Sequence, residues 1–285
     1  MVVRLGTPTS DNDGYIDGVV AQRQGGVNAG FFTNLTAGWK ARVQAYKDAG
    51  GDPSTLKPWP DVQGHAKKFH SLYLTPADDS VQGPVLQGLR SRELQLCPAC
   101  GEDGTPNTLD HYLPKQSYPE FSITACNLFP MCDICQGEKS IATVNAANER
   151  LFLHPYFDQF TDVQVFCLAI GRPFEAPESI SIKPYPGLGA AQHALVARHL
   201  HELGIGRRYN HFFKSEYIRL LRLVKSIRQK GQNVRTQLDT FCEYAQHKSV
   251  NSWGHVFYSG VIADAALMEY LSLIHISEPT RPLYI

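Results

Sequence analysis

The chain has 285 residues, of which 43% are hydrophobic, so it can bury a sizeable core in one domain with additions or in two modest domains. The 27 Lys and Arg residues balance the 27 Asp and Glu residues, which excludes a chain-wide positive charge, so any nucleic-acid surface must be local. The sequence contains neither a membrane-length apolar run nor the apolar segment of a secretion signal, so we expect a cytoplasmic protein with no membrane partner.

The amino-terminal third of the chain is expected to be a helical layer. Residues 1–35 are rich in Gly, Asn, Asp and Thr and show little periodicity, which predicts a loop or a poorly ordered arm. After that arm, apolar residues at helical spacing predict helices over residues 36–49, 62–74 and 80–94. The last of these helices leads directly into the first cysteine pair.

Two C-x-x-C pairs, Cys97 with Cys100 and Cys132 with Cys135, are candidate zinc ligands. Each such turn presents two thiolates, and two turns complete a tetrahedral site. In a reducing compartment, paired cysteines more often bind metal than form disulfides. Residues 101–131 separate the pairs, which is longer than a typical zinc ribbon, so a structured segment must be inserted there. The other cysteines, expected to be small buried hydrophobic residues, are Cys126, Cys167 and Cys242.

The inserted segment carries a compact set of polar residues. It contains L-D-H-Y-L-P-K, in which Asp110 and His111 are adjacent, and then N-L-F-P, which begins at Asn127. Gln136 and Lys139 follow the second cysteine pair. Carboxylate, imidazole and amide groups between paired metal ligands are the side chains that metal-assisted hydrolysis uses.

The pattern of residues 97–139 resembles the HNH endonucleases, also called the ββα-metal or His-Me finger class, in the zinc-containing subgroup with C-x-x-C, D-H, N-L and C-x-x-C-N-x-x-K. A weaker likeness through residues 152–158 is similar to a bacterial branch that carries L-D-H-Y-L-P-K and Y-P-E-F-S. The resemblance implies a two-stranded hairpin and a helix, which we expect over residues 138–150, with structural Zn²⁺ and catalytic Mg²⁺ or Mn²⁺. Some members of that branch accompany an ATPase in anti-phage defence, so an ATPase partner is a further implication.

The resemblance also implies roles that suit phosphodiester hydrolysis, which needs a cation on the phosphate and a base for the water. Asp110 would bind the divalent ion, and His111, neutral near pH 7, would take the proton from water. Asn127 would fasten the hairpin loop and orient His111. Lys139 and Lys115 would contact phosphate oxygens. Cleavage would leave a 5′-phosphate and a 3′-hydroxyl.

Gln136 marks a departure from the family pattern, which has Asn or His at this position as the second protein ligand of the catalytic ion. Its carbonyl oxygen can bind a hard cation, but the side chain is longer than Asn by about 1.5 Å. Because Mg²⁺ tolerates misplaced ligands badly, we expect Mn²⁺ to support cleavage at least as well. We expect Gln136 to point toward Asp110 and His111. His154 is predicted to be a hydrogen-bonded histidine that supports the site.

The rest of the chain is expected to combine short strands with helices. Apolar and polar residues alternate in places over residues 152–174 and 179–183, which predicts strands that extend the sheet of the hairpin. Helical spacing follows over residues 190–203, 207–230 and 234–248.

A local positive charge lies in this carboxyl-terminal region. Residues 198–235 contain ten Lys and Arg residues against Glu202 and Glu216, a local excess of eight. The residues expected to face a core are Ile218, Leu221, Val224 and Ile227. The residues expected to follow a DNA backbone are Arg219, Arg222 and Lys225. A charged face that only solvates the helix explains the same pattern equally well.

Residues 271–281 read L-S-L-I-H-I-S-E-P-T-R, which matches the translation of a widely used sequencing adaptor. We expect residues 271–285 to derive from that adaptor and to pack poorly. A genuine amphipathic tail is the alternative, because these residues continue the helical pattern of residues 261–270.

The expected fold is α+β, with a small zinc-stapled ββα hairpin flanked by amino- and carboxyl-terminal helical layers. The expected regions are 1–94 for the arm and helical layer, 95–150 for the nuclease core, 151–186 for the short strands and 187–270 for the basic helices. The expected function is metal-dependent cleavage of DNA, with RNA as an open alternative substrate. The other interpretation is a zinc-stapled nucleic-acid or partner-binding module that has lost its chemistry.

Overall fold

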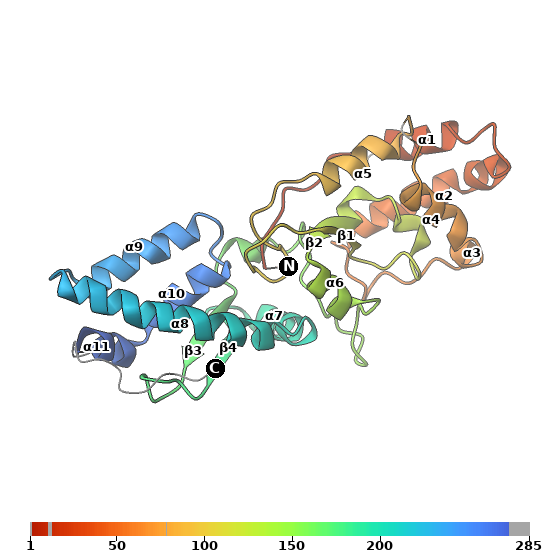
Figure 1. The fold of residues 1–285 in the computed structure, drawn as a ribbon. Coiled ribbons are helices and arrows are strands. Elements are labelled where there is room, and N and C mark those ends of the chain that lie inside the picture. The colour runs from red at the N-terminus through yellow and green to blue at the C-terminus, as the bar shows by residue number, and fades with distance from the viewer. Residues whose placement is uncertain (1, 11–12, 78, 274–285) are drawn as a thin grey trace. The chain divides into compact units, whose positions relative to one another are not determined.

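A computed structural model describes residues 2–10, 13–77 and 79–273 of the chain. These residues form helices and two small antiparallel sheets, which confirms the α+β class (Figure 1). The chain divides into two compact units, and each is described by itself. The first unit comprises the residues up to Ala99 together with Gly104–Gln159, and the second comprises Cys100–Asp103 together with the residues from Phe160 onward.

The amino-terminal part of the first unit is helical. Its helices are α1 (Asp13–Ala21), α2 (Ala29–Asp48), α3 (Pro60–Gln63), α4 (Ala66–Leu74) and α5 (Gln82–Arg90). The prediction of a loop over residues 1–35 is wrong, because α1 and the start of α2 lie there. One face of α1 is buried and carries Ile16, Val19 and Val20. The free energy gained by burying this face outweighs the cost of the helix-disfavouring residues around it.

Helix α2 confirms the prediction for residues 36–49 and begins earlier than expected. It ends before Gly50 and Gly51, whose φ angles of 58° and 70° are left-handed and suit glycine. A side chain cannot be placed at Gly51 without movement, because a Cβ atom there would lie 2.7 Å from the His154 ring. The end of α2 is therefore closely packed against the segment that follows the hairpin.

The next two predicted helices are present with changed ends. Helices α3 and α4 replace the single helix expected over residues 62–74, and Gly64 ends the first of them. Helix α5 lies within residues 80–94 but stops at Arg90. Both α4 and α5 contact the part of the unit that carries the hairpin. They can therefore contribute side chains to its surroundings.

A short antiparallel hairpin forms the centre of the first unit. Strand β1 (Thr108–His111) pairs with β2 (Leu128–Met131), so that Asp110 lies opposite Phe129 and His111 lies opposite Leu128. The loop between them contains two single helical turns, η1 (Pro119–Phe121) and η2 (Ala125–Asn127). Helix α6 (Asp133–Lys139) follows β2 directly.

The helix predicted over residues 138–150 is wrong, because α6 begins earlier and ends at Lys139. Ser140 then takes a left-handed conformation with φ 47°, and Val144 pairs with Arg150 across a turn. Ile141 is 61% exposed, so a longer helix would have buried little apolar surface.

The second unit has its own small sheet, of β3 (Phe166–Ile170) and β4 (Ile180–Pro184), which confirms that the region contains strands. The expectation that these strands extend the hairpin's sheet is wrong, because β3 and β4 pair only with each other in the described part of the chain. Helix α10 (Trp253–Ala263) packs against β3 closely enough that a Cβ atom at Gly260 would lie 2.8 Å from the Leu168 Cβ atom. The short helical turn η3 (Gln159–Asp162) spans the boundary between the units.

The remaining helices of the second unit confirm the helical prediction for the carboxyl-terminal third. They are α7 (Ala190–Glu202), α8 (Ile205–Gln229), α9 (Val234–Gln246), α10 (Trp253–Ala263) and α11 (Ala265–Leu273). The buried face of α8 consists of Ile205, Tyr209, Phe213, Tyr217, Leu220, Val224 and Ile227. The predicted core positions Ile218 and Leu221 are wrong, because both are only half-buried and neither belongs to this buried face.

Among the described helices, none is by itself both long enough and apolar enough to cross a membrane, and α10 and α11 reach that length and apolarity only as a pair bent by 83°. The prediction that the tail packs poorly is wrong for Leu271. This residue is buried in α11, where the side chains around it are still apolar. Leu273 is 62% exposed, and the rest of the tail, residues 274–285, lies outside the described residues.

Candidate metal centre and active site

The four predicted cysteines converge, as the spacing predicted. The sulfur atoms of Cys97, Cys100, Cys132 and Cys135 all lie within 4.8 Å of one another. Four thiolates around one Zn²⁺ at about 2.3 Å would be separated by roughly 3.8 Å, which this cluster can reach with small adjustments. Backbone N–H groups also face the sulfur atoms, with Cys132 N 3.4 Å from Cys97 Sγ and Cys135 N 3.5 Å from Cys132 Sγ. The cluster is therefore compatible with a structural zinc ion.

Asp110 and His111 end strand β1 and are both buried, with 8% and 5% of their surface exposed. Their side chains would point to opposite faces of an extended strand, but the strand ends at this pair. Lys139 Nζ links them, because it lies 2.9 Å from Asp110 Oδ2 and donates to the His111 carbonyl at 2.7 Å. The Lys139 ammonium therefore joins the Asp110 carboxylate to the backbone of His111.

The protonation of His111 follows from its hydrogen bond. Its Nε2 lies 2.9 Å from the Ser122 carbonyl oxygen, which can only accept, so Nε2 carries the proton and Nδ1 keeps a lone pair. Burial lowers the pKa of His111 to about 3, a shift that the bond to Ser122 opposes, and Lys115 and Lys139 lower it further. The ring of Tyr73 contacts the imidazole edge-to-face with ring centroids 4.5 Å apart. His111 is therefore a fixed, neutral imidazole with a basic nitrogen.

Asn127 fastens the hairpin loop, as predicted. Its Oδ1 accepts from Leu113 N at 2.8 Å, and its Nδ2 donates to the carbonyl oxygens of Leu113 at 3.0 Å and Phe121 at 3.2 Å. The bond to Phe121 lies next to Ser122, whose carbonyl oxygen accepts from the imidazole of His111. Asn127 thereby holds the backbone that sets the direction of His111.

Lys139 differs from the prediction that it contacts phosphate. It is fully buried, and its ammonium is directed to Asp110 and to the His111 carbonyl. A phosphate contact would require the side chain to leave these partners and reach solvent. Burial of a lysine is unusual without a paired carboxylate, which Asp110 supplies here.

Gln136 points toward Asp110 as predicted. Its Nε2 lies 3.4 Å from Asp110 Oδ1, and rotation of the amide would bring the carbonyl oxygen to the same place. Asp110 Oδ2 is buried and accepts no hydrogen bond in the described structure, although the Lys139 ammonium lies near it. A buried carboxylate oxygen with spare capacity, beside an amide, is a donor set that suits a hard divalent cation.

His154 is a hydrogen-bonded, fully buried histidine, as predicted. Its Nδ1 accepts from Tyr156 N at 3.1 Å, so its Nε2 donates to the Tyr46 hydroxyl oxygen at 2.8 Å. The Tyr46 hydroxyl in turn donates to the Cys126 carbonyl at 3.3 Å. This chain ties α2 and the hairpin loop to the segment after α6.

The predicted nucleic-acid contacts lie in different places. Lys115 is half-exposed beside the hairpin, and its carbonyl oxygen accepts from His70 Nε2 at 2.8 Å. Arg219 in α8 is exposed and pairs with Glu216 at 2.7 Å. Arg222 is exposed and Lys225 is half-exposed, and neither forms an ion pair with any residue that the structure describes.

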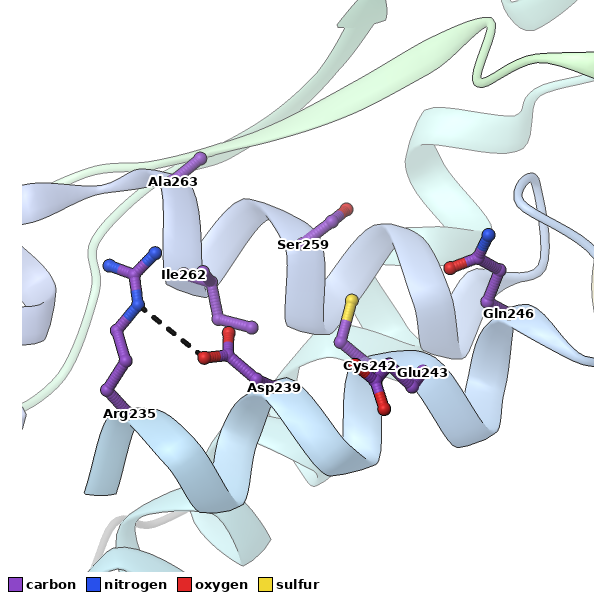
Figure 2. A pocket seen from close by; sticks show the side chains of 8 residues that line it. All are labelled: Arg235, Asp239, Cys242, Glu243, Gln246, Ser259, Ile262 and Ala263. Carbon is purple, nitrogen blue, oxygen red and sulfur yellow. Dashed lines mark ion pairs between the residues drawn. The ribbon is translucent and has the colours of Figure 1, made fainter. Parts of the chain in front are cut away.

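The leftover cysteines do not form a second reactive site. Cys126 is buried as predicted, whereas Cys167 and Cys242 are only half-buried. Cys242 lines a cavity of about 380 Å³ between α9 and α10, beside the ion pair of Arg235 with Asp239 (Figure 2). Burial, with smaller contributions from nearby carboxylates, raises the pKa of the Cys242 thiol, which keeps it protonated and a weak nucleophile.

Comparisons with known proteins give one partial likeness. No protein-family profile matches the chain, and no solved structure matches it. The chain is similar to Protein ea31 of Escherichia phage lambda, with 42% identity over 67 residues. Those residues make up 23% of this chain and 22% of Protein ea31, so the chain matches about a fifth of the length of that relative.

Proposed function

We propose that the chain is a metal-dependent HNH endonuclease that cleaves phosphodiester bonds in DNA. The observation that carries the proposal is the arrangement at the end of β1. There, a neutral imidazole and a buried carboxylate belong to adjacent residues, on a strand–strand–helix unit joined to the four-cysteine cluster. That combination resembles the family pattern in the order of its residues, with Gln136 as the departure.

The chain's own residues suit the base side of the reaction. The Ser122 carbonyl fixes Nε2 of His111 as the protonated nitrogen, so Nδ1 would accept the proton from an attacking water. Because burial lowers the pKa of His111 to about 3, the imidazole is neutral at pH 7, and the same shift makes Nδ1 a weaker base than that of an ordinary imidazole. Asn127 holds the loop that carries Ser122 and so limits rotation of the imidazole.

Asp110 and Gln136 are the residues that would hold Mg²⁺ or Mn²⁺. A bound divalent cation neutralises the phosphate and stabilises the leaving oxygen. Lys139 would hold the Asp110 carboxylate in place through their ion pair, and its bond to the His111 carbonyl would fix the carboxylate relative to the end of β1. We therefore assign Lys139 a positioning role in place of the phosphate contact expected from the sequence.

Helix α8 supplies a surface in the second unit that fits a nucleic-acid backbone. At 100° per residue, positions 207, 211, 214, 222 and 225 share one face, on the side of the helix away from its buried residues. The side chains at those positions are Arg207, His211, Lys214, Arg222 and Lys225. Basic residues in a line favour phosphate contacts that do not depend on sequence, so DNA and RNA are both possible ligands for this face.

A second candidate function is a zinc-stapled binding module without catalysis. The Lys139 ammonium lies 2.9 Å from Asp110 Oδ2 and could substitute for the divalent cation at the carboxylate. Gln136 is also longer than the family's usual ligand. In that case the hairpin would be a structural element and α8 would account for binding.

Incubation of the full chain with supercoiled plasmid DNA and Mg²⁺ or Mn²⁺ tests the proposal. We expect nicking by the unmodified chain, no nicking in excess EDTA, and a loss of about 10²- to 10⁴-fold in rate for His111→Ala. His201→Ala is the matched control, because that histidine is exposed in α7. Zinc content and thermal stability are measured in parallel. DNA binding with no nicking under either metal would favour the binding module.

A further inference from the structure

Tyr73 of α4 is a fixed platform beside the catalytic histidine. Its hydroxyl donates to the Leu109 carbonyl in β1 at 2.9 Å, and its ring contacts the ring of His111 at 4.5 Å between centroids. Burial raises the pKa of Tyr73, an effect that Arg90 opposes, so its hydroxyl stays protonated and remains a donor. The ring therefore has one position relative to β1 and the imidazole.

Two cations meet on this platform from different parts of the chain. The guanidinium carbon of Arg90, at the end of α5, lies 5.3 Å from the Tyr73 ring centroid. The ammonium of Lys115, in the hairpin loop, lies 5.5 Å from the same centroid. The bond from His70 Nε2 to the Lys115 carbonyl fixes the backbone that carries the lysine. Tyr73 therefore holds two positive charges near His111, and the Arg90 guanidinium also hydrogen-bonds the Tyr73 side chain.

Both cations are accessible to a ligand from solvent. Arg90 is exposed and Lys115 is half-exposed, and within the described residues neither forms an ion pair with a carboxylate. The carboxylate of this region, Asp110, already has the ammonium of Lys139 beside it. A cluster with two accessible cations and no accessible counter-ion attracts an anion, and the planar guanidinium fork matches the paired oxygens of a phosphate.

We propose that Tyr73, Arg90 and Lys115 form a phosphate clamp that binds the nucleic-acid backbone next to the phosphate that is cut. The inference rests on the proposed endonuclease function. The clamp would bind a phosphate of the same strand, and Tyr73 would keep that strand aligned with Nδ1 of His111. Arg90 and Lys115 contribute mainly to binding the substrate, so their loss raises KM more than it lowers kcat.

The test combines binding and cleavage for Arg90→Gln, Lys115→Gln and the double variant. Lys67→Gln is the matched control, because Lys67 is exposed on α4, the helix that carries Tyr73. Binding of a fluorescent 20-base-pair duplex is measured in EDTA over a range of salt concentrations, so that no cleavage is required. We expect each single variant to weaken binding about 3- to 10-fold and to reduce the slope of log affinity against log salt by about one, and the double variant to reduce that slope by about two.

Tyr73→Phe checks the platform, because it keeps the ring and removes the bond to Leu109. We expect a raised KM with an unchanged zinc content and circular dichroism spectrum. Inorganic phosphate and a mononucleotide are tested as separate ligands, because tight, Arg90-dependent binding of either without binding of the duplex would overturn a backbone clamp.

The two proposals fail in different ways. If the unmodified chain binds the duplex through Arg90 and Lys115 but never cleaves it, the clamp stands and the endonuclease proposal falls. If the chain cleaves DNA and the Arg90 and Lys115 variants match Lys67→Gln in KM, affinity and salt slope, the clamp is overturned and the endonuclease proposal stands.

Discussion

Replacing Lys139 by Met tests the ion pair at the centre of the hairpin. The side chains of Lys139 and Asp110 are only 1% and 11% exposed, so Asp110 would keep a nearly buried charge with no counter-ion. Breaking a buried pair by removing one partner costs about 3–5 kcal/mol, and the loss of a donor to the His111 carbonyl is part of that cost. Met occupies a similar volume, so packing changes little. We expect the melting temperature to fall by at least roughly 6 °C.

Mn²⁺ and a double-mutant cycle separate the ion pair from other effects of Lys139→Met. A cation that binds Asp110 at 100 times its Kd would stabilise the fold by about 2.7 kcal/mol, and the variant lacks the competing ammonium. We therefore expect Mn²⁺ to raise the urea midpoint of the variant more than that of the unmodified chain. In an Asp110→Asn background, Lys139→Met costs less and Mn²⁺ has no effect. Equal costs in both backgrounds would refute the reasoning.

Three further changes have defined outcomes. Cys135→Ser is expected to release zinc and destabilise the hairpin, whereas Cys167→Ser retains the metal; a Cys135 variant with full zinc content would contradict the cluster. Gln136→Asn is expected to keep cleavage, and Gln136→Ala to lower both the rate and the apparent metal affinity. Because burial lowers the pKa of His154, the unfolded chain binds a proton below pH 6.5 that the folded chain does not. The free energy of unfolding then falls by up to about 1.4 kcal/mol for each pH unit of acidification. His154→Gln is expected to remove this contribution from the dependence of the urea midpoint on pH.

The local patterns of the sequence predicted the parts of this structure that depend on spacing. The two C-x-x-C turns predicted the convergence of Cys97, Cys100, Cys132 and Cys135, because each turn fixes two ligands within four residues. The amphipathic spacing of residues 207–230 predicted α8, because a long helix with one apolar face has few alternatives.

The features that the sequence did not predict depend on contacts between distant segments. Residues 1–35 contain Gly and Asn, which disfavour helices. Helix α1 forms there because its apolar side chains are buried, and helix propensity does not take burial into account. Lys139 was expected to contact phosphate because of the family resemblance, and only the fold reveals the carboxylate that permits its burial. Tyr73 and Arg90 carry no motif, and their place beside His111 follows from how α4 and α5 pack on the hairpin.

The hairpin lies inside a loop that a metal at the four cysteines would close. Cys100 and Cys132 would be joined through the ion, and Asp110, His111 and Asn127 all lie between them. Closing a flexible loop of this length reduces the entropy of the unfolded chain by an amount equivalent to about 3–4 kcal/mol, by analogy with a covalent cross-link. Each doubling of the loop length adds only about 0.6 kcal/mol to this loop-closure contribution. Insertions between the two C-x-x-C turns would therefore change it little. The segment around η1 is held by its own contacts, because Phe121 and Ser122 are fully buried and their carbonyl oxygens bond Asn127 and His111.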